Sequence, residues 1–237
     1  MTPANFDKDT ILQGSVLLFD KPFTWSSFQL VKKIKYVSRA KKVGHAGTLD
    51  PLATGLLVIC TGTQTKTIST IQDAEKEYTG TIVLGSSTPS FDLETEPDYT
   101  FDYFQITKDQ VIAAALTLTG EINQAPPVYS AIKLSGVRAY EHARNGVAVE
   151  MKLRPVTVRE FEITGFNLPE VHFRITCSKG TYIRSIASDL GKALNNGAHL
   201  SKLVRTRIGE FKLEDAFSVA SFEALIKENN ENIQEPS

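Results

Sequence analysis

The chain has 237 residues, 41% of them hydrophobic, and a net charge of −1, which fits a globular protein with a buried core. No apolar run approaches the about 20 residues that a membrane-spanning helix needs, and the first residues do not form a signal peptide. We therefore expect a cytoplasmic protein with no membrane partner. Cys60 and Cys177 lie in apolar or alternating runs, which favours reduced, packed thiols, and the scattered histidines argue against a metal site.

A buried strand and a basic helix are predicted near the N-terminus. Residues 1–13 are polar and expected to be flexible, whereas residues 15–20 form an apolar run typical of a buried strand. Thr24 or Ser26 can cap the helix that follows. Its spacing predicts a solvated basic face and a buried face, and the buried face consists of Phe28, Val31 and Ile34.

A run of cations without an acid begins on this helix and ends in the next loop. It consists of Lys32, Lys33, Lys35, Arg39, Lys41 and Lys42. Such a run can be a solvated helix face or a surface that binds nucleic-acid phosphates. Its position directly before Gly44 favours the second interpretation.

The segment from Gly44 to Gly55 has no helical or strand period and is predicted to be a structured loop, followed by a strand at 56–60. Asp50 is flanked by small residues, and Pro51 fixes the turn after it. A carboxylate held in this way can serve catalysis. A structural Asx turn would use the same residues.

From residue 79 onward, predicted strands outnumber helices. The strands are expected at 79–84, 156–163 and 171–177. One helix should be capped by Thr107 or Asp109 and end at Gly120, a second should be capped by Thr181, and a last one should begin around residue 221. Residues 125–154 interrupt this pattern and are expected to form an insertion. The pattern predicts an α+β fold with a central mixed, largely antiparallel sheet flanked by helices. We expect one catalytic domain over residues 14–220 and a C-terminal helix with a disordered tail over 221–237.

The twelve residues Gly-His-Ala-Gly-Thr-Leu-Asp-Pro-Leu-Ala-Thr-Gly from Gly44 to Gly55 resemble the central motif of the TruB family of tRNA pseudouridine synthases. Further segments resemble other motifs of this family in the same order; they are Asp20-Lys21-Pro22, Lys76-Glu77-Tyr78, Gln124 to Lys133, Lys179 to Ser185 and Leu203 to Thr206. The resemblance implies the pseudouridine synthase catalytic fold, with residues 125–154 as an RNA-binding, thumb-like insertion. Thr24 replaces a glycine usual in the family, and we expect no PUA domain after Gly209.

The resemblance also implies a reaction and its residues. Uridine-55 in the T arm of tRNA would be isomerised to pseudouridine after base flipping, without metal or cofactor, accompanied by a tRNA-folding activity. Asp50 would be the catalytic carboxylate, Arg184 would pair with it, and Tyr78 would stack on the base. The implied substrate contacts are His45, as a wedge in the vacated space, Lys21, Pro22, Leu203, Tyr182 and Lys179; the implied RNA contacts are Lys32, Lys33, Lys35, Arg39, Lys41, Lys42 and Lys133.

Each of these residues also has an ordinary structural role. Arg184 can form a helix-surface ion pair, Tyr78 can be a core aromatic, and His45 can be a packed histidine. Two other functions are an RNA-binding or tRNA-folding protein without catalysis, and a pseudouridine synthase acting on rRNA. A carboxylate at Asp50 would repel phosphates in a simple binder, and Gly-Thr-Leu-Asp in place of Gly-Arg-Leu-Asp favours tRNA over rRNA. The expected partner is tRNA, and no protein partner is implied.

Overall fold

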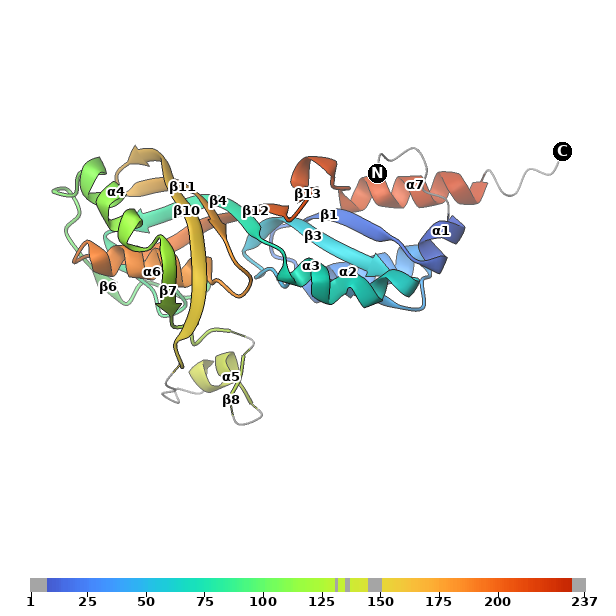
Figure 1. The fold of residues 1–237 in the computed structure, drawn as a ribbon, viewed down its shortest axis with the longest axis horizontal. Helices are drawn as coiled ribbons and strands as arrows, with labels where there is room; N and C mark the ends of the chain where they lie inside the picture. The colour runs from blue at the N-terminus through green and yellow to red at the C-terminus, as the bar shows by residue number, and fades with distance from the viewer. Residues whose placement is uncertain (1–7, 131, 135–136, 145–150, 232–237) are drawn as a thin grey trace. The chain divides into compact units, whose positions relative to one another are not determined.

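The computed structural model describes residues 8–130, 132–134, 137–144 and 151–231 (Figure 1). The chain forms two compact units: unit 1 comprises Met1–Glu77 and Val204–Ser237, and unit 2 comprises Tyr78–Leu203. Each unit contains helices and a largely antiparallel sheet. The predicted α+β class is therefore confirmed, whereas a single domain over residues 14–220 stays a prediction.

The sheet of unit 1 is built around one central strand, β3 (Ala53–Thr61). Strand β1 (Val16–Lys21) pairs with it antiparallel, and the strand order in this unit is β1-β3-β12, with β12 spanning Ala198–Ile208. The short β2 (Val43–His45) also pairs with β3, and β13 (Phe211–Lys212) pairs with β12. Nearly every residue of β3 is buried, because β3 is the central strand and elements pack on both of its faces.

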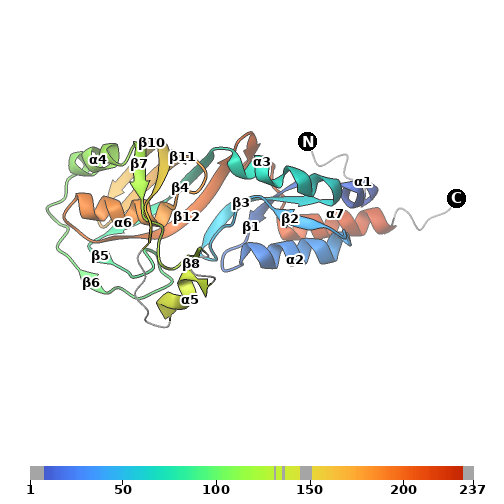
Figure 2. The same cartoon turned by 60° about the horizontal axis from the view of Figure 1, so that its bottom comes forward.

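Helices cover the two faces of the unit 1 sheet. Helices α2 (Ser27–Ser38) and α7 (Val219–Glu231) pack on the face that includes Phe19 and Leu57, and α3 (Ile68–Asp73) packs on the opposite face. Figure 2 shows α3 and α2 on opposite sides of the strands. The 3-10 helices Gly62–Thr67 and Leu213–Asp215 complete this unit.

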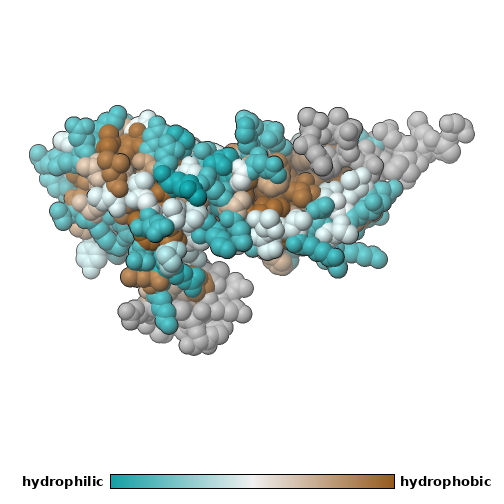
Figure 3. All heavy atoms as spheres, in the orientation of Figure 1, coloured by the Kyte–Doolittle hydropathy of each residue, from teal (hydrophilic) through white to brown (hydrophobic). Residues whose placement is uncertain are grey.

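The face that carries α3 remains partly open. Figure 3 shows hydrophobic residues gathered over β1 and β3 on this side of unit 1. Val16, Leu18 and Phe211 are partly buried there against Val58 and Cys60. Within the described residues, no helix has the length and hydrophobicity needed to cross a membrane.

Helix α2 differs from its prediction in one important respect. Ser26 caps it through a capping box with Gln29, as the sequence suggested. The buried positions are Ser27, Leu30, Val31, Ile34 and Ser38. Phe28 was predicted to be buried, but it is 61% exposed, because it lies beside this stripe at a helical repeat of about 100° per residue.

The prediction of a flexible segment over residues 1–13 is wrong for its second half. Lys8–Gln13 forms helix α1, in which Ile11 is fully buried. The Thr61 hydroxyl donates to the Ile11 carbonyl at 2.6 Å. Local polarity predicted flexibility, but the buried isoleucine fixes this segment. Residues 1–7 lie outside the described part of the chain.

In unit 2 the strand order is β12-β4-β11-β10-β7, with β4 at Lys76–Leu84. Strand β10 (Arg154–Asn167) pairs antiparallel with β11 (Glu170–Cys177) and with β7 (Gly120–Gln124). Gly120 was expected to end a helix; it begins β7 at a φ of 97°, a conformation that favours glycine.

The helices of unit 2 are α4 (Lys108–Thr117), capped by Thr107, and α6 (Ile183–Ala193). Helix α4 contacts both β10 and α6. The loop after β4 contains the two-residue strands β5 (Ser86–Ser87) and β6 (Tyr99–Thr100).

The predicted insertion lies between β7 and β10 in chain order (Figure 1). Its described part contains β8 (Lys133–Leu134), β9 (Val137–Arg138) and α5 (Ala139–Arg144). Lys133, an expected RNA contact, belongs to β8.

Candidate active site

The loop that carries Asp50 connects β2 to β3. Gly44 and His45 belong to β2 and Ala53 begins β3, so the irregular part is short. The Ala53 amide donates to the Asp50 carbonyl at 3.1 Å, which closes a turn directly after the carboxylate. Asp50 is partly buried. The prediction of a structured loop is confirmed.

Ser27 of α2 anchors this loop through its side chain. Its hydroxyl accepts a hydrogen bond from the Leu49 amide at 2.8 Å and donates one to the Leu49 carbonyl at 3.1 Å. Both residues are buried. The residue directly before Asp50 is therefore fixed by a side chain in the first turn of the helix.

Arg205 anchors the same loop from β12. Its guanidinium, 1% exposed, donates to the carbonyls of Leu56 at 2.8 Å, Gly47 at 3.1 Å and Thr48 at 3.4 Å. A planar group with several fixed donors suits three carbonyls that face different directions. The sequence placed Arg205 in a family segment but gave it no role.

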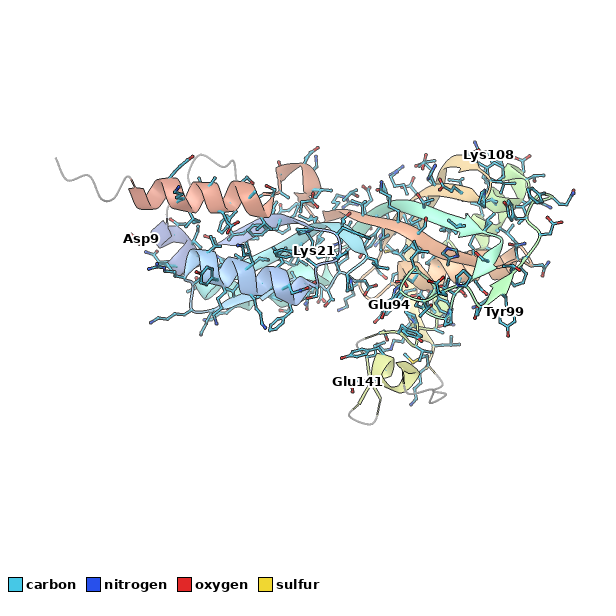
Figure 4. All side chains as sticks on the ribbon, turned by 180° about the vertical axis from the view of Figure 1, so that it is seen from behind. Asp9, Lys21, Glu94, Tyr99, Lys108 and Glu141 are labelled. Atoms are coloured by element: carbon cyan, nitrogen blue, oxygen red, sulfur yellow. The ribbon has the colours of Figure 1, made fainter. Side chains whose placement is uncertain are left out.

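Lys21 holds the residue after Asp50. Lys21, labelled in Figure 4, ends β1 and is fully buried. Its ammonium donates to the carbonyls of Trp25 at 2.5 Å, Pro22 at 2.9 Å and Pro51 at 3.4 Å. The Thr24 amide also donates to the Pro51 carbonyl, at 2.9 Å. Thr24 has a φ of 68°, so the residue that replaces the usual glycine adopts a left-handed conformation.

Two nearby groups have shifted pKa values. Burial lowers the pKa of Lys21 from 10.5 to about 8, and the Asp50 carboxylate opposes this shift by favouring the ammonium form. Burial also lowers the pKa of His45 below its usual 6.5, with the Gly47 backbone opposing the shift and Arg205 adding to it. The His45 imidazole is therefore neutral at pH 7.

Arg184, expected at the active site, belongs to unit 2 and is 4% exposed in the first turn of α6. Its Nε lies 3.6 Å from Oδ2 of the buried Asp92, and its Nη1 donates to the Ser90 carbonyl at 3.2 Å. Both partners are buried, so this is not the helix-surface ion pair named as the alternative role of Arg184, and its pairing with Asp50 stays a prediction. Asp92 had no role predicted from the sequence.

The start of α6 is fixed by a residue distant in sequence. Thr181 was predicted to cap this helix, but its hydroxyl bonds the Ser178 carbonyl instead. The buried Gln124 side chain accepts from the Tyr182 amide at 2.7 Å and donates to the Tyr182 carbonyl at 3.1 Å. A partner 58 residues away cannot be found from local capping patterns.

The remaining predicted residues are distributed between the units. Tyr78 on β4 is 9% exposed and Leu203 on β12 is 8% exposed, and both belong to unit 2. Lys179, which is exposed, and Tyr182, which is partly buried, belong to the same unit. Asp50, His45, Lys21 and Pro22 belong to unit 1.

The basic run belongs to unit 1, and most of its members are exposed; these are Lys32, Lys35, Arg39, Lys41 and Lys42. Lys33 is different, because its ammonium lies 2.5 Å from the Glu223 carboxylate of α7. In the described residues, no group of three or more His, Cys, Asp or Glu side chains is placed to hold a metal ion.

Sequence comparison matches residues 35–183 to the TruB family pseudouridylate synthase N-terminal domain and residues 184–235 to the tRNA pseudouridylate synthase B C-terminal domain. A tRNA pseudouridine synthase B of Flavobacterium johnsoniae is 53% identical over 234 residues, covering 96% of this chain and 100% of the relative. One of Chloroherpeton thalassium is 46% identical over 223 residues, covering 90% and 91% of the two chains.

Solved structures give a similar result. A chain in a Cbf5-Nop10-Gar1 complex is 29% identical with a TM-score of 0.77, and one in an H/ACA RNP bound to a substrate RNA containing 2′-deoxyuridine is 26% identical with a TM-score of 0.74. The present chain is covered to 99% in both alignments but spans only 61% and 60% of those two chains.

Proposed function

Because this chain belongs to the TruB family of pseudouridylate synthases, we propose that it converts uridine-55 in the T arm of tRNA to pseudouridine, with Asp50 as the catalytic carboxylate. The enzyme is an isomerase: the bond from ribose C1′ to N1 breaks, the base turns, and C1′ joins C5. No group is lost and no electrons are exchanged overall. A carboxylate can attack or stabilise C1′, or remove a proton from the sugar, and then assist proton loss at C5.

The observation that carries this proposal is the fixed backbone on both sides of Asp50. Ser27 holds Leu49, and Lys21 and Thr24 hold Pro51. A reacting carboxylate must be positioned to within about 0.5 Å, and these contacts restrict its backbone. The Lys21 ammonium and the Asp50 carboxylate attract each other, and the reaction requires the carboxylate in its ionised form.

Tyr78 and Arg184 are proposed to act with Asp50, Tyr78 by stacking on the uracil and Arg184 by orienting the carboxylate. Asp92 and Ser90 hold the Arg184 guanidinium, which supports a precise orientation for it. Leu203, Tyr182 and Lys179 complete the proposed substrate contacts, and no cofactor is needed.

The uridine must leave its stack before C1′ can be reached, at a cost of a few kcal/mol. A neutral His45 is suited to fill the vacated space, since it adds no charge between stacked bases. Lys32, Lys35, Arg39, Lys41, Lys42 and Lys133 are proposed to contact phosphates; Lys33 contributes less, because Glu223 neutralises it. Unfolding the T arm to extrude the base also supports a tRNA-folding activity.

The test uses an unmodified tRNA transcript and pseudouridine mapping with the wild type and Asp50→Asn. We expect product only at the T-arm uridine, none from Asp50→Asn, and equal tRNA binding by both proteins. Asp189→Asn is the matched control, because Asp189 lies on α6 and pairs with Lys192 at 2.9 Å. Product from Asp50→Asn would disprove the role of Asp50, and product from a transcript with cytidine at the target position would disprove the site.

A further inference from the structure

The outer face of α2 exposes two large aromatic side chains. Phe28 is 61% exposed and Tyr36 is 82% exposed, whereas the buried face of the same helix packs in the core of unit 1. Neither ring contributes to the α2 capping box or to the core cluster. Two such rings on one helix face give a surface on which planar groups can stack.

Cations lie between these rings. At about 100° per residue, Phe28, Lys32, Lys35 and Tyr36 fall within an arc of about 100°, and the two rings are about 12 Å apart along the helix axis. The Lys32 ammonium lies 4.7 Å from the centroid of the Phe28 ring, a cation–π contact that fixes their mutual orientation. We call these four residues the aromatic–basic stripe.

The charge of this helix is of one sign. Helix α2 contains no acidic residue, and Lys32 and Lys35 are exposed. Lys33 points to Glu223 of α7, so its charge is compensated outside the stripe. The stripe is therefore aromatic and positively charged.

We propose that the aromatic–basic stripe binds the tRNA substrate by stacking unpaired nucleobases on Phe28 and Tyr36 while Lys32 and Lys35 contact phosphates. Alternating rings and cations match surfaces that bind single-stranded nucleic acid, whereas protein interfaces are depleted in lysine. The spacing of the rings equals about three to four stacked nucleotides. This inference rests on tRNA being the substrate.

The test measures the affinity of wild type and variants for a tRNA transcript at several salt concentrations. Phe28→Leu with Tyr36→Leu removes the ring faces but keeps apolar side chains that favour helix, so we expect Kd to rise at least about tenfold with an unchanged salt dependence. Lys32→Gln should lower the slope of log K against log salt by about one. Tyr99→Leu, at a 68% exposed tyrosine of β6 in unit 2, is the matched control and should bind like wild type.

Two further readouts separate the outcomes. The single-turnover rate of the double leucine variant at saturating protein should equal that of wild type, since both rings are exposed and the contacts that hold Leu49 and Pro51 come from Ser27, Lys21 and Thr24. Tyr36→Trp should show fluorescence quenching by tRNA, the signature of a base stacked on the ring.

An unchanged Kd for the double leucine variant would overturn the inference. So would self-association of the wild type that the double variant abolishes without a change in Kd, because the stripe would then bind a second copy. If the wild type forms pseudouridine but the double leucine variant binds tRNA as tightly as the wild type does, only this inference fails. If the wild type forms no pseudouridine, the proposed function fails.

Discussion

The Ser27 hydroxyl holds both the amide and the carbonyl of Leu49, at 2.8 and 3.1 Å. Ser27→Ala would leave both buried backbone groups without this partner, at about 1–3 kcal/mol of stability, and would release the residue before Asp50. We expect kcat to fall at least about tenfold with little change in KM. Ser38→Ala is the control, because Ser38 is buried on the same helix but bonds the Ile34 carbonyl; equal losses of kcat in both variants would contradict this role.

Arg205→Lys keeps a positive charge but replaces a planar donor group by a compact one. A lysine cannot reach the carbonyls of Leu56, Gly47 and Thr48 together, so we expect a lower kcat and unchanged tRNA affinity. Arg207→Lys is the matched control, because Arg207 lies two residues further along β12 and pairs with Glu75 at 3.0 Å. Full activity of Arg205→Lys would show that the guanidinium is not needed to position the loop.

Activity should depend on the protonation of Lys21. Its amine loses a donor to the backbone carbonyls as pH rises through about 8, so the single-turnover rate should fall there. Unfolding does not explain such a fall. The folded protein releases this proton near pH 8 and the unfolded chain near pH 10.5. The contribution of this group to the free energy of unfolding therefore rises with pH between these values. Lys21→Met should be less active and lack this alkaline limb; the same limb in the variant would assign it to another group.

Thr24→Gly should stabilise the protein. Thr24 adopts a φ of 68°, which costs a β-branched residue about 1–2 kcal/mol. Glycine removes this strain, but it also increases the conformational entropy of the unfolded chain, which offsets part of the gain in stability. We expect a Tm increase of a few degrees in thermal denaturation, with the Pro51 contact retained. Thr24→Ala should give no increase, since alanine keeps the strain; a lower Tm for Thr24→Gly would disprove the argument.

Asp92→Asn should lower kcat without weakening tRNA binding. It removes the charge that faces the buried Arg184 guanidinium, and breaking a buried ion pair costs about 3–5 kcal/mol, so rates must be compared at a temperature where the variant is folded. Asp98→Asn, in the same loop and bonded to the Ser87 hydroxyl, should be silent. A normal rate for folded Asp92→Asn would limit Asp92 to a structural role.

Local sequence patterns predicted the elements that depend on residues close together in the chain. The apolar run of β1, the alternation of β11 and the caps Ser26 and Thr107 were all visible in the sequence. The helical period of α2 identified a buried face but shifted it toward Phe28, because neighbouring positions at the edge of an apolar stripe differ by only about 60–100°. The roles of the site residues stay predictions.

The missed residues share a physical cause. Arg205 bonds Leu56 across 149 positions, and Gln124 bonds Tyr182 across 58. Such contacts satisfy buried backbone groups, and no period or cap signals them. Arginine and glutamine within recognised motifs are nevertheless candidates, since a buried polar side chain must have partners.

Helix α1 sets a practical limit for anyone who shortens or tags this protein. Ile11 is fully buried, and the Thr61 hydroxyl connects its carbonyl to the Ser15 amide. Cutting the chain at Gly14 would therefore open a void under α2 and leave Thr61 without an acceptor. Fusions and proteolytic trimming should preserve everything from Lys8 onward.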